Sequence, residues 1–529
     1  MQPVRFLPAA FVFALVVALY FPTLHGGFVY DSIAQVLYSD YIHTPSNWAD
    51  VLTLRVVGQD ELDRNRPLHL ASLMVDAAIW GTNPFGYRLT SVLLHALNAA
   101  LLFLFIAISF LRNDSSGRDE RLARPSTVER ACGPRAPTTI FAAAFGALLF
   151  ALHPLVVEAI AEPSNREDLL VLLPMLIGLL VIVSCARLSW GANTLLIICS
   201  LFAVLAKESG IAVPFVFAVA CWLFRRGDLQ GFVPGLIGGF AAAAGFLFAS
   251  YVWQPGGSTI FVNLPQPLAD DFWTILGVQL RIWTLQLGQI LWPWNLSAHY
   301  PPQAIAEISL PVAFTAVAVA VLLAVLVWRV DRLAALGVAV YVLCLLPASN
   351  FAAQYHPIAD RYLYVPLAGF GMVAAALVHR LRIPNSRGLA GGALIAGLLF
   401  LLSLAYAANL RRQLIWQQPA TLWSDVLRQY PNVSQAQIGL ANAHYRAGDF
   451  QAARSAATEA VVSGGGRWAD AWSLRALCEW QTGDRAAAGR SFREAKSLSR
   501  VYGSADSMER ALLWSPEQLS VLAEIAREQ

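Results

Sequence analysis

The sequence has few charged residues. Only 13% of its 529 residues are Asp, Glu, Lys or Arg, and 57% are hydrophobic, with a mean hydropathy of +0.54. Soluble domains usually carry about 25% charged residues. The composition therefore excludes an ordinary soluble domain and predicts a polytopic membrane protein. The net charge of +3 and the lack of a basic tract argue against a nucleic-acid partner.

Cysteine and lysine are also scarce. The six cysteines are scattered, most of them in apolar runs, and none forms a CxxC pair. This pattern argues against a disulfide framework and against a zinc site. Lysine occurs only at Lys207 and Lys496, whereas arginine and alanine are abundant, which favours a bacterial source. GxGxxG and Walker motifs are absent, so no nucleotide-binding fold is expected.

Long apolar runs dominate residues 1–410. A spanning helix needs roughly 20 apolar residues, which predicts about eleven spans. The first run lacks a clear small-x-small cleavage site, so we interpret it as a retained helix and not as a signal peptide. Residues 67–80 are too short to cross and are expected at the interface. The expected spans lie near 6–22, 88–111, 139–161, 169–186, 190–206, 209–224, 231–253, 309–328, 333–348, 363–379 and 388–409.

Arginine-rich loops predict the orientation, because Lys and Arg mark the cytoplasmic side. Residues 272–294 are long enough to cross but contain Arg281 and three glutamines. If they are re-entrant or interfacial, all basic loops fall on one side. The N-terminus is then cytoplasmic, and the first outer loop, 23–87, and the C-terminal part lie outside. The basic loops are 112–138 and those near residues 187, 225, 328 and 379.

Residues 411–529 are alanine-rich and polar, unlike the preceding part. Residues 436–460 and 471–495 align with a period of 35, close to the 34 of tetratricopeptide repeats. An ordinary helical hairpin domain is the alternative. Repeats of this kind form concave surfaces that bind polypeptides. We predict repeats near 431–465 and 466–500, with a helix of a preceding repeat before them and a capping helix at 515–529.

Ionisable residues gather on the outer side in this topology. Such groups are costly at membrane depth and mark functional sites by default. Asp31 is the first acid after the first expected span. The set comprises Asp31, Arg66, His153, Glu158, Arg166, Glu167, Asp168, Lys207, Glu208, His356, Asp360 and Arg361.

Each of these residues also has a structural interpretation. Asp31 could be a solvated loop acid, and Lys207 with Glu208 could form an ion pair at a helix end. His153 precedes Pro154 and could satisfy a carbonyl that the proline leaves free. Taken together, however, the groups favour one chemistry. A carboxylate can deprotonate an acceptor hydroxyl while nearby cations stabilise a phosphate leaving group, as in sugar transfer from a lipid phosphate.

Several long segments resemble a known family, in the same order along nearly the whole chain. They are "GGFVYDS", "NRPLHLASLMVDAAIWGTNPFGYRLTSVLLHALNAALL", "LLFALHPLVVEAIAEPSNREDLL", "LAKES", "ADRYLYVP" and "IWQQPATLWSDVL". With the repeats, they resemble the transmembrane and tetratricopeptide-repeat O-mannosyltransferases and their bacterial homologues, in the GT-C superfamily. The resemblance implies an all-α, GT-C-like membrane domain at 1–410 followed by a repeat domain at 411–529. It also implies inverting transfer from a polyprenyl-phosphate-linked sugar.

The resemblance assigns the catalytic acid of the first outer loop to Asp31. The candidates to hold the donor phosphate are Arg361, which is the first choice, and His356, Lys207 and Arg166. Supporting roles are expected for Asp360, Glu208, Asp168, Glu158, His153 and Arg66. The family usually has two adjacent acids, but here the second is Ser32. Because Mg²⁺ and Mn²⁺ favour carboxylate oxygens, one remaining acid favours a metal-free reaction, and no cofactor is expected.

The acceptor remains open between two classes. The repeats favour Ser or Thr of a polypeptide, and the alternative is a lipid-linked glycan of the lipid A or O-antigen type. The resemblance does not carry over mannose as the sugar. A non-enzymatic scaffold or transporter would instead distribute polar residues along a pathway through the spans. The expected location is the bacterial inner membrane, with the repeats outside.

Overall fold

The structure is a computed structural model. It describes residues 6–59, 61–116, 136–185, 189–252, 271–351, 354, 356–381, 389–504, 507–508 and 514–528. Most of the expected cytoplasmic loop 112–138 therefore lies outside the described residues, as do the centres of the basic loops near 187 and 379.

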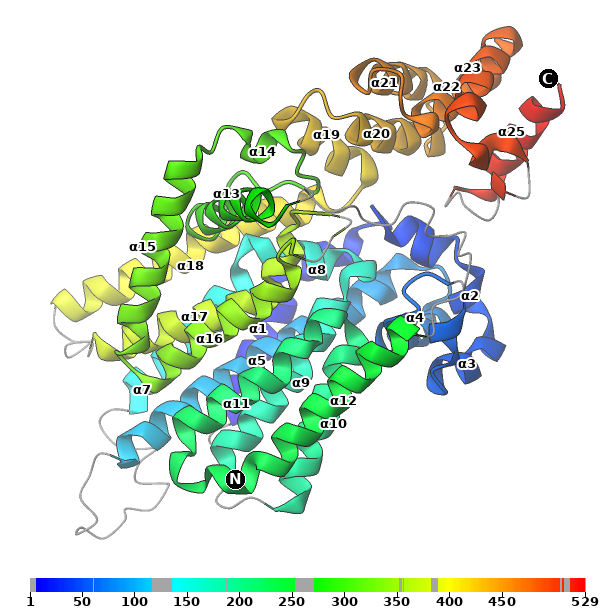
Figure 1. The fold of residues 1–529 in the computed structure, drawn as a ribbon. Coiled ribbons are helices and arrows are strands. Elements are labelled where there is room, and N and C mark those ends of the chain that lie inside the picture. The colour runs from blue at the N-terminus through cyan, green and yellow to red at the C-terminus, as the bar shows by residue number, and fades with distance from the viewer. Residues whose placement is uncertain are drawn as a thin grey trace.

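A bundle of apolar helices forms the first part of the chain (Figure 1). The part that the structure describes contains helices and turns but no strand. The N-terminus and the repeat domain lie at opposite ends of the bundle. The main helices are α1 (Phe6–Leu19), α5 (Pro84–Ser116), α7 (Ala136–Leu152), α9 (Glu167–Ser184), α10 (Trp190–Ala206), α11 (Ala212–Phe224), α12 (Val233–Val252), α13 (Phe272–Leu291), α15 (Leu310–Trp328), α16 (Arg332–Leu345), α17 (Tyr364–Arg380) and α18 (Leu389–Ile415).

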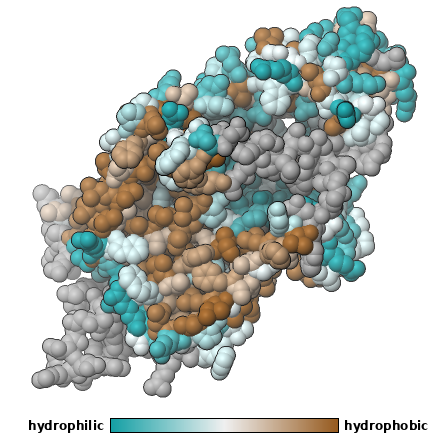
Figure 2. All heavy atoms as spheres, in the orientation of Figure 1, coloured by the Kyte–Doolittle hydropathy of each residue, from teal (hydrophilic) through white to brown (hydrophobic). Residues whose placement is uncertain are grey.

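The protein is a multi-pass membrane protein. Six described helices are long and apolar enough to cross a membrane, and five shorter apolar helices accompany them. A seventh span results if α7 and the short helix α8 (Val157–Ala161) count as one, bent by 52°. The break lies at His153, directly before Pro154, whose nitrogen cannot donate a helix hydrogen bond. Hydrophobic side chains cover the bundle surface, whereas polar ones cover the repeat domain (Figure 2). The count of eleven spans stays a prediction.

Helix α13 lies across the bundle. Figure 1 shows it nearly end-on, whereas most of the bundle helices lie close to the plane of the view. It is not among the helices apolar enough to cross. Its polar residues Gln279, Gln286 and Gln289 are buried, and Gln279 Oε1 accepts hydrogen bonds from Asn350. This arrangement is in line with an interfacial or re-entrant segment at 272–294.

Short helices build the loop between α1 and α5, which is the expected first outer loop. They are α2 (Asp40–His43), α3 (Trp48–Leu52) and α4 (Pro67–Trp80), and α14 (Gln303–Ala306) adds a turn before α15. The fully buried Val36 and Val56 of this loop belong to an apolar cluster that also includes Val204 of α10 and Phe246 of α12. A loop that packs on the bundle in this way can hold charged side chains in fixed positions.

The repeat domain follows the expected period of 35 residues. Gly448 and Gly483 have φ of +79° and +86° and end the first helix of each pair. Asp449 and Asp484 then cap the second helix by accepting a backbone N–H. The helices are α19 (Pro419–Gln429), α20 (Ser434–Arg446), α21 (Phe450–Ser463), α22 (Ala469–Gln481), α23 (Arg485–Leu498) and α25 (Pro516–Arg527).

Helix α25 covers one face of the repeats. Gln518 is fully buried and donates to Asn442 of α20 at 2.9 Å. Leu522 and Ile525 are buried in the same core as residues of α20 and α22. A helix is thus present within the range predicted for the capping helix. It packs mainly on α22 and α23, the two helices of the second repeat, and the hydrogen bond to Asn442 reaches α20.

A buried ion-pair network joins the repeat domain to the membrane domain. Arg412 of α18 contacts Asp360 at 3.1 Å and Asp425 of α19 at 3.5 Å. Asp360 also accepts a hydrogen bond from the Tyr300 hydroxyl at 2.6 Å. All three charged side chains are less than one tenth exposed.

Helices α7 and α17 approach closely at two glycines, and this contact predicts a sensitive position. A Cβ added at Gly371 would lie 2.6 Å from the carbonyl oxygen of Gly146. Gly371→Ala should therefore force the helices apart and cost about 1–3 kcal/mol, as overpacking does. Thermal unfolding of the purified protein in detergent should show a lowered Tm. Gly397→Ala, in α18 with open space around it, is the matched control; equal Tm values for the two variants would contradict the prediction.

Candidate functional site

A cavity of about 590 Å³ opens at the end of the bundle that carries the repeats. One wall is apolar and includes Val171, Pro347 and Val365. The rest is strongly charged, since the ionisable lining residues are Asp31, Asp63, Arg64, Arg66, Glu167, Asp168, Lys207, Glu208, His356 and Arg361. Eight of these ten come from the outer charged set that the sequence singled out.

Asp31 lies in a loop that other parts of the chain hold in place. Arg88 of α5 donates to the carbonyls of Gly27 at 2.6 Å and Trp416 at 2.8 Å. Tyr30 has a left-handed φ of +49°, and its ring lies 5.4 Å from that of Trp423 in α19. A non-glycine residue with positive φ is held there by its surroundings. The backbone before Asp31 is thus fixed by α5 and by the first helix of the repeat domain.

The environment of Asp31 makes it a stronger base than a solvated aspartate. Burial raises the pKa of its carboxyl to about 6; the Arg361 guanidinium opposes this shift, and the Asp63 and Glu158 carboxylates add to it. At neutral pH Asp31 is therefore mostly ionised, and its pKa is close to the operating pH. This is the favourable range for a general base.

Arg361 forms a buried ion pair with Glu158. Its guanidinium contacts Glu158 Oε1, and its backbone N–H donates to Glu158 Oε2 at 3.2 Å. Arg361 belongs to the turn that precedes α17, and Glu158 belongs to α8. The ion pair connects α8 to the turn before α17. Arg361 also lines the cavity.

Lys207 lies between two carboxylates of α9. Its ammonium is 2.6 Å from Asp168 Oδ2 and 3.5 Å from Glu167 Oε1. Burial alone would lower the pKa of Lys207, but the two carboxylates outweigh it, so the pKa is raised and the side chain stays charged. The sequence predicted Lys207 as a phosphate ligand and Asp168 as a supporting residue, and both line the cavity.

Arg66 connects the outer loop to the same cluster. It contacts Asp63 at 3.0 Å, Glu208 at 3.1 Å and Glu167 at 3.3 Å. Asp63 has a left-handed φ of +52°, and burial raises the pKa of its carboxyl to about 6 even though Arg66 opposes the shift. Strained residues cluster at functional sites. Asp63 was missed in the sequence, although it stands three positions before Arg66 and just before the quoted segment that begins at Asn65.

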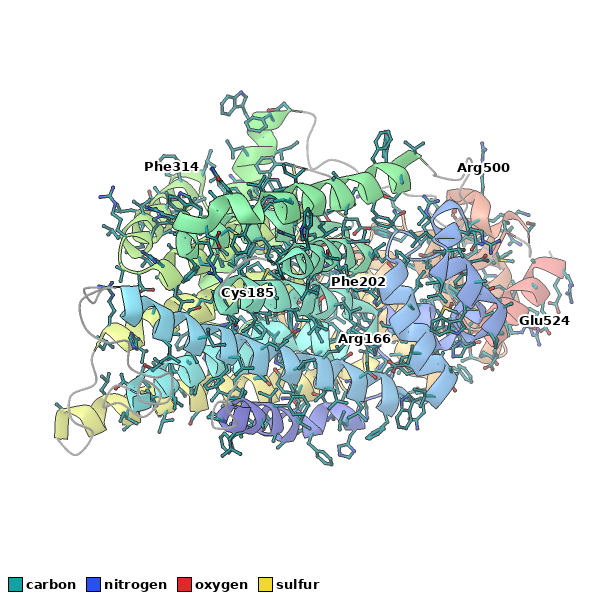
Figure 3. All side chains as sticks on the ribbon, turned by 90° about the horizontal axis from the view of Figure 1, so that it is seen from below. Arg166, Cys185, Phe202, Phe314, Arg500 and Glu524 are labelled. Carbon is teal, nitrogen blue, oxygen red and sulfur yellow. The ribbon has the colours of Figure 1, made fainter. Side chains whose placement is uncertain are left out.

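Arg166 does not line the cavity, which corrects the expectation that it holds the donor phosphate. Its guanidinium is fully buried and lies 2.6 Å from Asp76 of α4. It also donates to the Tyr87 carbonyl at 2.7 Å and to Ser91 Oγ at 3.1 Å. Figure 3 shows Arg166 inside the bundle. The side chain joins α4 and α5 to the start of α9.

His153 and Asp360 also lie away from the cavity lining. His153 accepts the Leu155 N–H through Nδ1 and contacts the Ile290 carbonyl through Nε2 at 3.0 Å. This contact is structural, but the Ile290 carbonyl lies at the end of α13 and is not one that Pro154 leaves free. Asp360 is held by Arg412 in the network described above.

His356 lines the cavity but is not a cation. Burial lowers the pKa of its imidazole to about 3, and the charge of Arg361 acts in the same direction. Its role as a ligand of the donor phosphate stays a prediction and would not rest on a positive charge. A neutral imidazole can still donate a hydrogen bond to a phosphate oxygen.

Ser32 points away from the cavity. It is fully buried, and its hydroxyl donates to the Val29 carbonyl at 2.8 Å. Its backbone N–H donates to Glu162 Oε1 at 2.5 Å. No group of three His, Cys, Asp or Glu side chains within the described ranges is arranged to hold a metal ion.

Comparisons with known proteins agree with the repeats and the sequence resemblance. A family model described as tetratricopeptide repeat matches residues 417–467 and 438–500. Protein O-mannosyl-transferase Tmtc1 of Drosophila melanogaster is 28% identical over 56% of this chain and 34% of its own length. F38B6.6 of Caenorhabditis elegans is 23% identical over 80% of this chain and 57% of its own. Protein O-mannosyl-transferase TMTC4 of Homo sapiens is 25% identical over 64% of this chain and 50% of its own length.

The chain is similar to transmembrane and tetratricopeptide-repeat O-mannosyl-transferases. It spans between about a third and somewhat over half of the length of these relatives. Among solved structures, ArnT from Cupriavidus metallidurans bound to undecaprenyl phosphate matches 92% of this chain and 79% of its own. The identity is 14% and the TM-score is 0.37.

The position of Arg166 predicts a stability effect. Arg166→Met leaves Asp76 as a buried, unpaired carboxylate and should cost about 3–5 kcal/mol of stability. The double variant Arg166→Met/Asp76→Leu removes both charges and should recover most of that loss. Thermal unfolding of both variants in detergent measures the difference. If the double variant is no more stable than the single one, the Arg166–Asp76 pair is not the main role of this arginine.

Proposed function

We propose that the protein is an integral-membrane glycosyltransferase. It transfers a sugar from a polyprenyl-phosphate-linked donor to an acceptor hydroxyl on the outer side of a bacterial plasma membrane. The observation that carries the proposal is the cavity in which the carboxylate of Asp31 lies with the buried cations Arg361 and Lys207. The similarity to O-mannosyl-transferases supports glycosyl transfer and makes mannose the first sugar to test.

In the proposed reaction Asp31 is the general base. Its carboxylate accepts the proton of the acceptor hydroxyl while that oxygen attacks the anomeric carbon. The bond between the anomeric carbon and the phosphate oxygen breaks, and its electron pair leaves with the polyprenyl phosphate. Attack opposite the leaving group inverts the anomeric configuration. The step as written uses Asp31 alone and assigns no role to a metal.

The cations of the cavity act on the leaving group. Arg361 is the first candidate, because its guanidinium reaches the cavity from a fixed position on Glu158. Lys207 is the second, and the neutral His356 can add a hydrogen bond. Preorganised donors of this kind stabilise charge that develops in the transition state. The apolar wall near Val365 suits the first isoprene units of the donor lipid.

A polypeptide acceptor is the class we favour. The repeat domain lies at the same end of the molecule as the cavity, since Arg446 of α20 lies 5.5 Å from the Tyr38 ring of the outer loop. Trp423 of α19 packs on Tyr30, the residue before Asp31. A chain that binds the repeats is therefore close to the base. Transfer to extracted envelope glycolipids, and not to peptides, would instead favour a lipid-linked glycan as acceptor.

The role of Asp31 predicts a large loss of activity on its removal. Asp31→Asn keeps the size of the side chain but cannot accept the proton, so transfer should fall by about 10²–10⁴-fold. Transfer of labelled mannose from a polyprenyl-phosphate donor by the reconstituted protein is the measurement. Asp40→Asn, in an exposed position of the same loop, is the control and should keep full activity. Normal transfer by Asp31→Asn would exclude the assigned role.

The raised pKa of Asp31 predicts the acid limb of the pH profile. The carboxyl must be ionised to accept a proton, so kcat/KM should fall about tenfold per pH unit below pH about 6. The profile of the wild-type protein between pH 4.5 and 8 tests this. An acid limb near pH 4 would show that a solvated carboxylate, and not Asp31 in this cavity, controls the step.

A further inference from the structure

Glu162 is a buried acid directly behind the base. Its side chain is fully buried in the turn between α8 and α9. One oxygen, Oε1, accepts the backbone N–H of Ser32 at 2.5 Å and the hydroxyl of Ser164 at 2.6 Å. The contact with Ser32 fixes the peptide bond that follows Asp31, although the two residues are 130 positions apart in sequence.

The other oxygen of Glu162 has no hydrogen-bond partner. Glu162 Oε2 is buried and unpaired. Burying an ionised carboxylate with an unsatisfied oxygen costs free energy. The protonated form avoids the cost of burying a charge, so it is favoured here. Burial raises the pKa of Glu162 to about 8, and the negative charge of Asp31 adds to the shift. The charged groups that act on Glu162 are Asp31 and Arg88.

We propose that Glu162 is a positioning residue for Asp31, and that it acts as the neutral second carboxyl of an Asp31–Glu162 pair. The inference rests on the proposed function, because it assigns the base to Asp31. The resemblance to the family leads one to expect two adjacent acids, but here position 32 is a serine that faces away from the cavity. Glu162 reaches the same peptide from another part of the chain.

The two carboxyls have different roles because their surroundings differ. When two such groups are close, one of them keeps a proton more readily than the other. Glu162 is sealed from solvent and keeps the proton, whereas Asp31 borders the cavity and stays ionised at neutral pH. An ionised Glu162 would raise the pKa of Asp31 and reduce the fraction of active base. Groups with separated pKa values are typical of paired acids in enzymes.

Glu162→Gln and Glu162→Ala separate this role from a purely structural one. The glutamine is neutral and its oxygen can accept the Ser32 N–H, so kcat at pH 7 should stay within about 3-fold of wild type. The alanine removes the acceptor, so kcat should fall about 10-fold or more, with KM changed less than 2-fold, as expected when a base is misplaced. Glu307→Gln, an exposed glutamate, controls for the substitution itself.

The pH dependence of stability tests the protonated state directly. In the folded protein Glu162 keeps its proton up to pH about 8, whereas an unfolded glutamate releases it near pH 4.5. Protonated Glu162 thus contributes stability that is lost as the pH rises from about 4.5 to 8. The Tm of wild type should fall more over this range than the Tm of Glu162→Gln. Equal slopes would overturn the neutral-carboxyl assignment even if Glu162→Ala fails to fold.

The outcomes distinguish the inference from the function on which it rests. If wild type does not transfer sugar from the polyprenyl-phosphate donor, the proposed function fails. If wild type is active and Glu162→Ala keeps its kcat, only the role of Glu162 is excluded. If Glu162→Gln loses activity as strongly as Glu162→Ala, an ionised Glu162 is required and the neutral pair is wrong.

Discussion

The buried ion pair between Arg361 and Glu158 is the contact on which the site depends. It joins α17 to the short helix α8 after the bend at Pro154, and it leaves the guanidinium facing the cavity. Removing one partner of such a pair leaves an uncompensated charge, which is far more costly than losing the pair as a whole. The charges of Arg361 and Glu158 also act on Asp31, so the bend, the turn before α17 and the loop of Asp31 depend on one another electrostatically.

The fold was largely predictable from the sequence because it depends on local patterns. The length of the apolar runs predicted the spanning helices, and the period of 35 residues in glycine and alanine positions predicted the two repeats. The sequence predicted one continuous span at 139–161, whereas the structure breaks it between α7 and Pro154. The number of crossings was not fixed by these patterns, because several apolar helices, such as α11 and α16, are shorter than a bilayer needs. Whether such helices cross depends on how they pack and tilt within the bundle.

The site was predictable only in part. Asp31, Lys207 and Arg361 were singled out because a charge at the end of an apolar run is unusual, and all three line the cavity. Arg166 met the same criterion, but the orientation of its turn directs it to Asp76 and away from the cavity. Glu162 was missed, although it is also an outer acid next to a proline. Its importance comes from a contact with a backbone amide 130 residues away, and no local motif encodes that contact.

Arg412 forms ion pairs with both parts of the chain, so the repeat domain contributes to the charge balance of the membrane domain. Arg412 balances Asp360, the neighbour of Arg361, and also Asp425, which belongs to α19. A chain cut before α19 would lose Asp425, Trp423 and the packing on Tyr30 in one step. Such a truncated protein would lack more than an acceptor-binding module, because the cut would also remove contacts that support the cavity. The two parts of the chain thus share a buried ion-pair network at this boundary.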